Sequence, residues 1–185
     1  MSESVHLTTQ QLETGLGPIR ESPTESGTLE MIVRRPVTEQ REVIEEGELD
    51  LREGLLGDNW RARGSKDTDD GSAHPEMQLN IMNARTAELI AGDRSRWPLA
   101  GDQLYLDLDL SGSNLPPGSR IRIGEAVVEV TAEPHRGCRK FMERFGKDAL
   151  RIVNSTDGVA LNLRGINAKV VEPGTIRVGD VAAKL

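Results

Sequence analysis

The sequence predicts a mostly β protein, either a sandwich or a barrel, with a few short helices. The clearest sign is the segment at residues 104–110, in which leucine occupies every second position. Such period-two alternation is typical of a β-strand with one buried face. Several other short apolar segments end at glycine- or proline-rich turns. Many short strands separated by turns of this kind favour an all-β architecture.

Two strands are expected in the first two thirds of the chain. The first begins near Thr28, where apolar and polar residues alternate, and ends at Pro36, because proline cannot donate a hydrogen bond to a neighbouring strand. The second is the leucine-alternating segment. Its leucines are expected to face the core, and Tyr105, Asp107 and Asp109 are expected to form a solvent-facing side.

The remaining strands are expected in the last third of the chain. Residues 120–123 and 126–131 flank a two-residue turn and predict a β-hairpin. Residues 161–171 predict either one strand or two strands broken near Gly165. A last short strand is expected at residues 176–178, between two glycine-containing turns.

Helices are expected at three places. Residues 9–16 predict a short helix that is closed by a Gly-Pro pair, and residues 82–91 predict a second one. In residues 138–153 the apolar side chains recur at helical spacing. Gly146 lies in the middle of that segment and is expected to divide it into two short helices.

The first quarter of the chain carries the whole net charge. Of the total of −7, residues 1–50 contribute −7 through 11 acidic and 4 basic residues, and residues 51–185 hold 19 of each sign. An acidic leading segment is usually a solvated surface or a flexible arm. We therefore expect residues 1–27 to form an acidic, largely flexible arm with a short helix, and residues 28–185 to form the folded domain.

Composition excludes several classes of protein. A chain of 185 residues suffices for one domain and a short tail, and its net charge of −7 has the wrong sign for binding nucleic acid. No apolar run approaches the roughly 20 residues of a membrane-spanning helix. The N-terminus lacks a basic and apolar signal sequence, and the single cysteine excludes an internal disulfide. We expect a soluble cytoplasmic protein that binds neither nucleic acid nor membranes.

Cys138 is the first candidate for chemistry. It follows Gly137 at the start of an expected helix, where free backbone N–H groups favour negative charge. Residues 133–151 also hold six lysines and arginines against three acidic residues. Both features favour a thiolate that reacts or binds a metal. The alternative is a small buried core residue, because Cys138 also fits the apolar helical pattern.

Other common site motifs are missing from the sequence. The three histidines and one cysteine do not have the spacing of a zinc site, and no nucleophile-elbow or P-loop motif is present.

The sequence resembles the MOSC domain, named for the C-terminal domain of molybdenum cofactor sulfurase and found alone in many bacterial proteins. The resemblance extends over about 155 residues, and its most specific part is the order of short motifs around the central cysteine. These motifs are Gly27-Thr28-Leu29-Glu30, Gly54-Leu55-Leu56-Gly57-Asp58, Pro116-Pro117-Gly118, Ile123-Gly124, Gly137-Cys138-Arg139-Lys140-Phe141, Arg144-Phe145-Gly146, Val153-Asn154-Ser155, Leu163-Arg164-Gly165-Ile166, Gly174-Thr175-Ile176 and Gly179-Asp180.

The resemblance implies a β-barrel-like fold with a cleft and one cysteine placed to bind molybdenum or sulfur. In related molybdenum enzymes, such as the amidoxime-reducing component, the equivalent cysteine coordinates the metal of a molybdopterin, and Cys138 matches this catalytic and metal-binding position. A thiolate is a soft metal ligand, and arginine can hold the pterin phosphate through two hydrogen bonds. The residues implied to bind the cofactor are Arg136, Arg139, Lys140, Arg164, Asn154, Gly57 and Asp58.

The sequence departs from the family pattern at two motifs. Many members carry a histidine two places after the Gly-Asp pair, where this chain has Asn59-Trp60. A Gly-Glu-Asn-Leu-like stretch is replaced by Gly101-Asp102-Gln103-Leu104. The full-length sulfurase also has a separate pyridoxal-phosphate domain with a Schiff-base lysine. This chain has no room for that domain, so pyridoxal phosphate is not expected.

Three functions remain open at this point. In the first, the protein binds molybdenum cofactor or relays sulfur through Cys138, and a reductase would take electrons from a redox partner protein, because the sequence has no flavin, haem or iron–sulfur signature. In the second, it is a non-enzymatic module that binds a small sulfur species or docks a partner through its acidic arm. In the third, Cys138 is a core residue and a basic cleft binds an unrelated anion.

Overall fold

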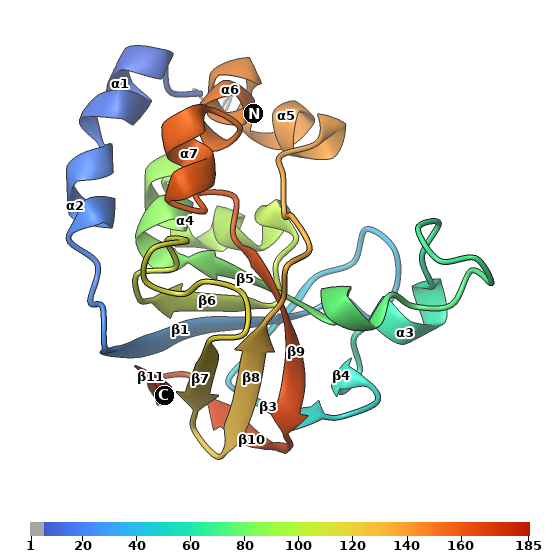
Figure 1. Cartoon of the computed structure of the whole chain (residues 1–185). Coiled ribbons are helices and arrows are strands. Elements are labelled where there is room, and N and C mark those ends of the chain that lie inside the picture. Colours follow the sequence, from blue (N-terminus) through green and yellow to red (C-terminus); the bar gives the residue numbers. More distant parts are fainter. Residues whose placement is uncertain (1–5) are drawn as a thin grey trace.

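The computed structural model describes residues 6–185 and has a closed barrel of seven strands at its centre (Figure 1). The sheet order is β11-β7-β8-β9-β5-β6-β1, and β1 pairs back with β11 to close the ring. Only β5 and β6 pair in parallel within the ring. The barrel strands are β1 (Ser26–Arg34), β5 (Leu79–Asn83), β6 (Leu104–Asp107), β7 (Arg120–Ile123), β8 (Ala126–Val130), β9 (Ile166–Glu172) and β11 (Val181–Lys184). The barrel confirms the expected mostly β fold.

Four further strands lie outside the ring. The strand β2 (Glu42–Ile44) pairs with the end of β1, and β10 (Gly174–Arg177), β3 (Glu46–Asp50) and β4 (Gly54–Leu55) form a separate small sheet. The chain that leaves β1 therefore turns back along it as β2, and it then forms β3 and β4 before it reaches β5.

Short helices gather mainly at one end of the barrel, drawn at the top of Figure 1. There, α4 packs near α2 and β5, and α6 contacts α1, α5 and α7. The helices are α1 (Thr9–Thr14), α2 (Leu16–Arg20), α3 (Trp60–Arg63), α4 (Ala84–Ala91), α5 (Arg139–Phe145), α6 (Lys147–Val153) and α7 (Thr156–Ala160), with 3-10 helices η1 (Pro75–Met77) and η2 (Arg94–Ala100). Among residues 6–185, none of these helices has the length and apolar character needed to cross a membrane.

Two apolar cores lie on opposite sides of β1. Leu29 and Ile32 belong to the core inside the barrel, and Met31 and Val33 belong to a second core between the barrel wall and the helices. The pairing of β1 with β6 shifts register between Leu29 and Met31, so the side-chain alternation is offset at that point. Because both faces are covered, the strand is apolar on both faces rather than on one.

The expected solvent-facing side of the leucine-alternating strand is wrong at Tyr105. This side chain is fully buried, and its hydroxyl donates to the Trp97 carbonyl at 2.7 Å. The helices α4 and η2 cover this face of β6, and the strand ends at Asp107 rather than at residue 110. Asp107 and Asp109 keep partial exposure, as expected from their charge.

The helices at residues 138–153 agree with expectation. Gly146 separates α5 from α6 with a φ of +93°, a conformation that L side chains rarely adopt. The helix expected at residues 82–91 begins two residues later, because Met82 and Asn83 complete β5. The Asn83 side chain then accepts a hydrogen bond from the Arg85 N–H and caps α4.

The described part of the acidic arm is packed against the domain, which departs from the largely flexible arm expected. Two helices occupy it instead of one, and α1 begins with a capping box made by Thr8 and Gln11. Leu12, Leu16 and Ile19 are buried in the second core. Residues 1–5 of the arm lie outside the described residues.

Candidate functional site

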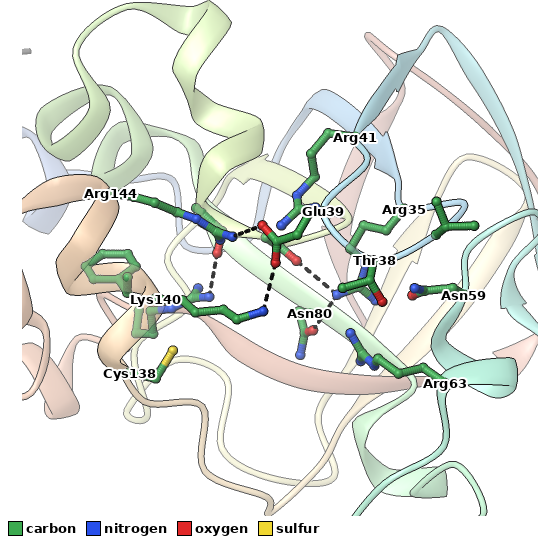
Figure 2. A pocket seen from close by; sticks show the side chains of 15 residues that line it. Arg35, Thr38, Glu39, Arg41, Asn59, Arg63, Asn80, Cys138, Lys140 and Arg144 are labelled. Atoms are coloured by element: carbon green, nitrogen blue, oxygen red, sulfur yellow. Dashed lines mark hydrogen bonds and ion pairs between the residues drawn. The ribbon is translucent and has the colours of Figure 1, made fainter.

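A cleft of about 220 Å³ opens beside the end of β1, between the loop that follows this strand and the start of α5 (Figure 2). Its walls come from segments that are far apart in sequence. The lining residues are Arg35, Val37, Thr38, Glu39, Arg41, Asn59, Arg63, Asn80, Ala100, Gly101, Cys138, Lys140, Phe141, Arg144 and Arg164.

The cleft carries an excess of positive charge. Six of its lining residues are arginine or lysine and one is acidic, and two of the arginines are paired with buried carboxylates behind the wall. Six cations against these three carboxylates leave a net charge of +3. This sign is opposite to the net charge of −7 for the chain. A cleft that gathers one sign of charge attracts ligands of the opposite sign.

The first of the buried pairs joins Arg35 to Asp58. The guanidinium Nε and Nη2 donate to the two carboxylate oxygens, each at 2.8 Å, and the Arg35 backbone N–H donates to the same carboxylate at 2.9 Å. The Asp58 side chain has no exposed surface and also accepts from the Trp60 N–H. Asp58 therefore lies behind the cleft and fixes Arg35 in its wall.

The second buried pair joins Arg164 to Asp102. Arg164 Nη1 donates to the carboxylate at 2.6 Å and Nη2 donates to the Ala100 carbonyl at 2.8 Å. His135 Nε2 donates to the other carboxylate oxygen at 3.0 Å. Burial acts to raise the pKa of Asp102, but Arg164 and His135 together outweigh it and hold that pKa below its usual range. The carboxylate stays ionised and holds both partners.

Glu39 lies between two other cations of the cleft. Its carboxylate oxygens accept from Lys140 Nζ at 2.8 Å and from Arg144 Nη2 at 3.0 Å, as the dashed lines in Figure 2 show. Arg144 Nη1 also donates to the Leu99 carbonyl at 2.8 Å. Lys140 and Glu39 are both more than half exposed, so this ion pair is in contact with solvent.

Arg41 and Arg63 are the least neutralised cations of the cleft. Arg41 donates only to backbone carbonyls, and within residues 6–185 neither side chain has an acidic partner. Burial, followed by the charge of Arg144, lowers the pKa of Arg41. Partial burial, followed by the charge of Arg35, lowers the pKa of Arg63. Each guanidinium lies near other cations, and a bound anion would offset the repulsion between these like charges.

Cys138 is exposed and its sulfur points into the cleft (Figure 2). It is the N-cap of α5, but its side chain makes no capping hydrogen bond there. The preceding Gly137 is held by Asn154, which accepts from the Gly137 N–H at 2.9 Å and donates to its carbonyl at 3.0 Å. Asn154 therefore fixes the backbone that carries the thiol. The exposed position argues against the alternative of a buried core cysteine.

Two buried polar atoms among the cleft residues have no hydrogen-bond partner within the described part of the chain. They are Asn59 Oδ1 and Arg164 Nε, an acceptor and a donor. Buried polar groups are normally paired, so an unpaired donor and acceptor in one cleft are free for a ligand or a water molecule.

The residues that the resemblance implies as cofactor-binding do not all lie at the cleft. The structure places Cys138, Lys140 and Arg164 in the cleft wall, and it places Asp58 and Asn154 behind the wall as supports. The other three residues lie elsewhere: Arg136 lines a second cavity, Arg139 is 84% exposed and pairs with Glu143, and Gly57 lies against Arg34 with a φ of +84°.

Sequence reasoning missed much of the cleft's charge. Arg35, Glu39 and Arg41 belong to one loop, and Arg63 ends α3. A signal was present for the loop, because the segment after Arg34 combines charged residues with Pro36 at the end of a strand. No periodicity relates this loop to Cys138, about one hundred residues away, so only the fold brings them together.

Comparison with protein families identifies the class of protein. The model of the MOSC domain matches residues 58–183, about two thirds of the chain. This chain therefore belongs to the MOSC domain family, and the resemblance seen in the sequence is confirmed. No curated protein matches the sequence.

Solved structures with a similar fold include standalone proteins. The YuaD protein from Bacillus subtilis has a TM-score of 0.62 and 19% identity, over 85% of this chain and 96% of that one. YiiM from Escherichia coli has a TM-score of 0.55 and 19% identity, over 85% of this chain and 69% of that one. YiiM from Geobacillus stearothermophilus has a TM-score of 0.52 and 12% identity, over 89% of this chain and 74% of that one. At these identities the likeness concerns the fold.

A metal centre made by the protein alone is not present in the part of the chain that the structure describes. No three histidine, cysteine, aspartate or glutamate side chains there come together as a group that could hold a metal ion. A metal at Cys138 would therefore have fewer than three such protein ligands and would take its remaining ligands from outside these side chains.

Proposed function

We propose that the cleft binds an anionic molybdenum-pterin cofactor, with the Cys138 sulfur as the protein ligand to the metal. The observation that carries the proposal is an exposed thiol that points into a cleft with a net charge of +3. The family is named for an enzyme of molybdenum cofactor metabolism, and the single thiol suits a metal whose remaining ligands belong to the pterin.

The donor set of the cleft fits such a group. A thiolate is a soft ligand suited to a metal that is also bound by sulfur. Arg41 and Arg63 have no acidic partner within residues 6–185, and their guanidinium groups suit a phosphate. Asn59 Oδ1 is an unpaired acceptor for a ring N–H, and Arg164 Nε is an unpaired donor.

When bound, the cofactor would supply redox chemistry at molybdenum. The chain's own part would be to orient the cofactor and to hold the thiol at the cleft wall through the Asn154 hydrogen bonds to Gly137. With one cysteine the chain cannot supply the four thiolates of an iron–sulfur cluster. Reductive chemistry would therefore require a partner protein that donates electrons.

Sulfur relay through Cys138 is the second candidate. It is supported by the exposure of the thiol and by the cations beside it, Lys140 and Arg144, which would stabilise an anionic persulfide. In this case the cleft would accept a small sulfur species, and no metal would be needed. The two candidates use the same thiol but load it with different atoms.

The test is elemental analysis of protein purified from a host that makes molybdenum cofactor. We expect stoichiometric molybdenum in the wild type and its loss in Cys138→Ser, because a hydroxyl is a harder and weaker ligand for this metal. Arg139→Gln is the matched control, since Arg139 adjoins Cys138 but lies outside the cleft wall. It should retain the metal.

Retention of molybdenum by Cys138→Ser would reject the thiol as the metal ligand. Absence of molybdenum from every variant would favour sulfur relay, which intact-protein mass spectrometry would detect as a persulfide on wild-type protein that is missing in Cys138→Ser. Absence of both would leave binding of an unrelated anion as the function of the cleft.

A further inference from the structure

We propose that Glu39 is an internal counter-ion that sets the minimum negative charge of a ligand in this cleft. An anion must displace the Glu39 carboxylate from Lys140 and Arg144 before it can use those cations. Ligands with one negative charge would gain little by the exchange, and ligands with two or more would be selected. The inference rests on the proposed function only in that the cleft binds anions.

The contacts of Glu39 occupy two cations at once. One carboxylate oxygen accepts from Lys140 and the other from Arg144, so neither oxygen is left for solvent alone. Within residues 6–185 these are the ion pairs that Lys140 and Arg144 form. The positions of the two carboxylate oxygens are therefore positions that the oxygens of a phosphate or carboxylate ligand could take. Figure 2 shows the Glu39 carboxylate in the middle of the cleft, with Arg41 and Arg63 on other sides.

The carboxylate is also easy to displace. Glu39 is 58% exposed, and its partners Lys140 and Arg144 are 62% and 19% exposed. Ion pairs of a carboxylate this exposed to solvent contribute little to stability. The Glu39 backbone has a φ of +66°, a left-handed conformation that is uncommon for glutamate. Its neighbours Val37, Thr38 and Gln40 are exposed as well. Movement of this loop would uncover little apolar core.

The selection follows from counting the cations that remain. A ligand with one negative charge that takes the place of Glu39 at Lys140 and Arg144 exchanges one carboxylate-type contact for another. A ligand with two charges can reach Arg41 or Arg63 as well, and these have no acidic partner within the described residues. Only the second ligand gains new ion pairs, so Glu39 discriminates between the two.

Two phosphate esters provide matched probes. At about pH 8 methyl phosphate carries close to two negative charges, because its second proton is lost with a pKa of roughly 6, whereas dimethyl phosphate carries one. Binding of each ester would be measured by NMR titration of wild type and Glu39→Gln. Glu42→Gln is the matched control, because Glu42 is an exposed partner of Arg34 close to Glu39 in sequence and lies outside the cleft wall.

We expect the wild type to bind methyl phosphate and to bind dimethyl phosphate much more weakly. Glu39→Gln should raise the affinity for dimethyl phosphate by about 2-fold to 30-fold, the range that the two ion pairs of the exposed Glu39 carboxylate represent. The gain for methyl phosphate should be smaller, so the preference for the dianion falls. Glu42→Gln makes the same change in net charge and should leave both affinities within about 2-fold.

Equal behaviour of Glu39→Gln and Glu42→Gln would overturn the inference, as would a loss of affinity in Glu39→Gln. In either case the wild type could still bind methyl phosphate and Arg63→Ala could lose that binding. This result would leave the anion-binding cleft and the proposed function standing. Failure of every variant to bind either ester would remove the anion site itself, and the proposed function with it.

Discussion

At the scale of single residues, the site depends on buried carboxylates that no ligand would touch. Asp58 and Asp102 have no exposed side-chain surface, and each fixes an arginine in the cleft wall. Both residues were visible in the sequence, Asp58 as part of a family motif and Asp102 as part of a departure from one. Removing one partner of a buried ion pair usually costs more than the pair contributes, because the other charge is then left unpaired.

His135 should make the stability of the protein depend on pH. Burial, then the charge of Arg164, lowers the pKa of His135, although the hydrogen bond to Asp102 acts to raise it. In the unfolded chain a histidine titrates near 6.5. Below about that pH the unfolded state binds more protons than the folded state, so the free energy of unfolding falls as the pH is lowered toward the native pKa.

Denaturant unfolding at pH 7.5 and pH 5.5 would measure this effect. His135→Gln keeps an N–H donor for Asp102 and cannot titrate, so wild type should lose more stability than this variant between the two pH values. The extra loss should be at most about 1.4 kcal/mol, because pH 5.5 lies one unit below the unfolded-state pKa. His74→Gln is a control on a histidine that lies outside the Asp102 network. An equal loss in wild type and His135→Gln would show that the pKa of His135 is the same in the folded and unfolded states.

At the scale of elements, the sequence pattern predicts strands and helix breaks well. It predicts poorly which other elements pack against them. Gly146 divides α5 from α6 as expected, since a break is a local property of one residue. The Tyr105 face of β6 is covered by α4 and η2, and period-two alternation cannot show which distant element covers a strand. The same limit applies to the arm, in which Leu12, Leu16 and Ile19 are buried despite its acidic composition.

The packing of α1 gives a direct test of the arm. Leu12 is 1% exposed in the second core, so Leu12→Ala should lower the free energy of unfolding by about 2–5 kcal/mol. Glu13→Ala changes an exposed neighbour on the same helix and should change stability by less than about 0.5 kcal/mol. Chemical denaturation of the three proteins would compare them. Equal stabilities would mean that the arm contributes no packing in solution.

At the scale of the whole molecule, the negative net charge does not reveal that positive charge is concentrated in one cleft. A chain with a net charge of −7 builds a cleft with a net charge of +3 from residues of several separate segments. Of the cleft residues, the motif around Cys138 and the later Arg164 were predictable. Glu39, Arg41 and Arg63 were not, because their proximity to Cys138 is produced by barrel closure and by the loop after β1.

The concentrated charge should make the melting temperature of the molecule sensitive to anions. Pyrophosphate at 100 times its Kd should stabilise the fold by about 2.7 kcal/mol, which raises the Tm of a chain of this size by about 5–11 °C. The shift should shrink as ionic strength rises. Differential scanning calorimetry would compare wild type with the double variant Arg41→Ala/Arg63→Ala. An equal shift in both proteins would place the anion elsewhere.

The pairing of β1 with β11 also means that the barrel cannot close until β11 has been synthesised. Residues 26–28 of β1 pair with residues 181–183 of β11, which are synthesised about 155 residues later. At about 5–20 residues per second, the backbone N–H and C=O groups of this part of β1 stay without their β11 partners for a time on the order of 10 s. Until β11 has been made, the other six barrel strands can form only an open sheet, and the unpaired part of β1 is a site at which another chain could add a strand.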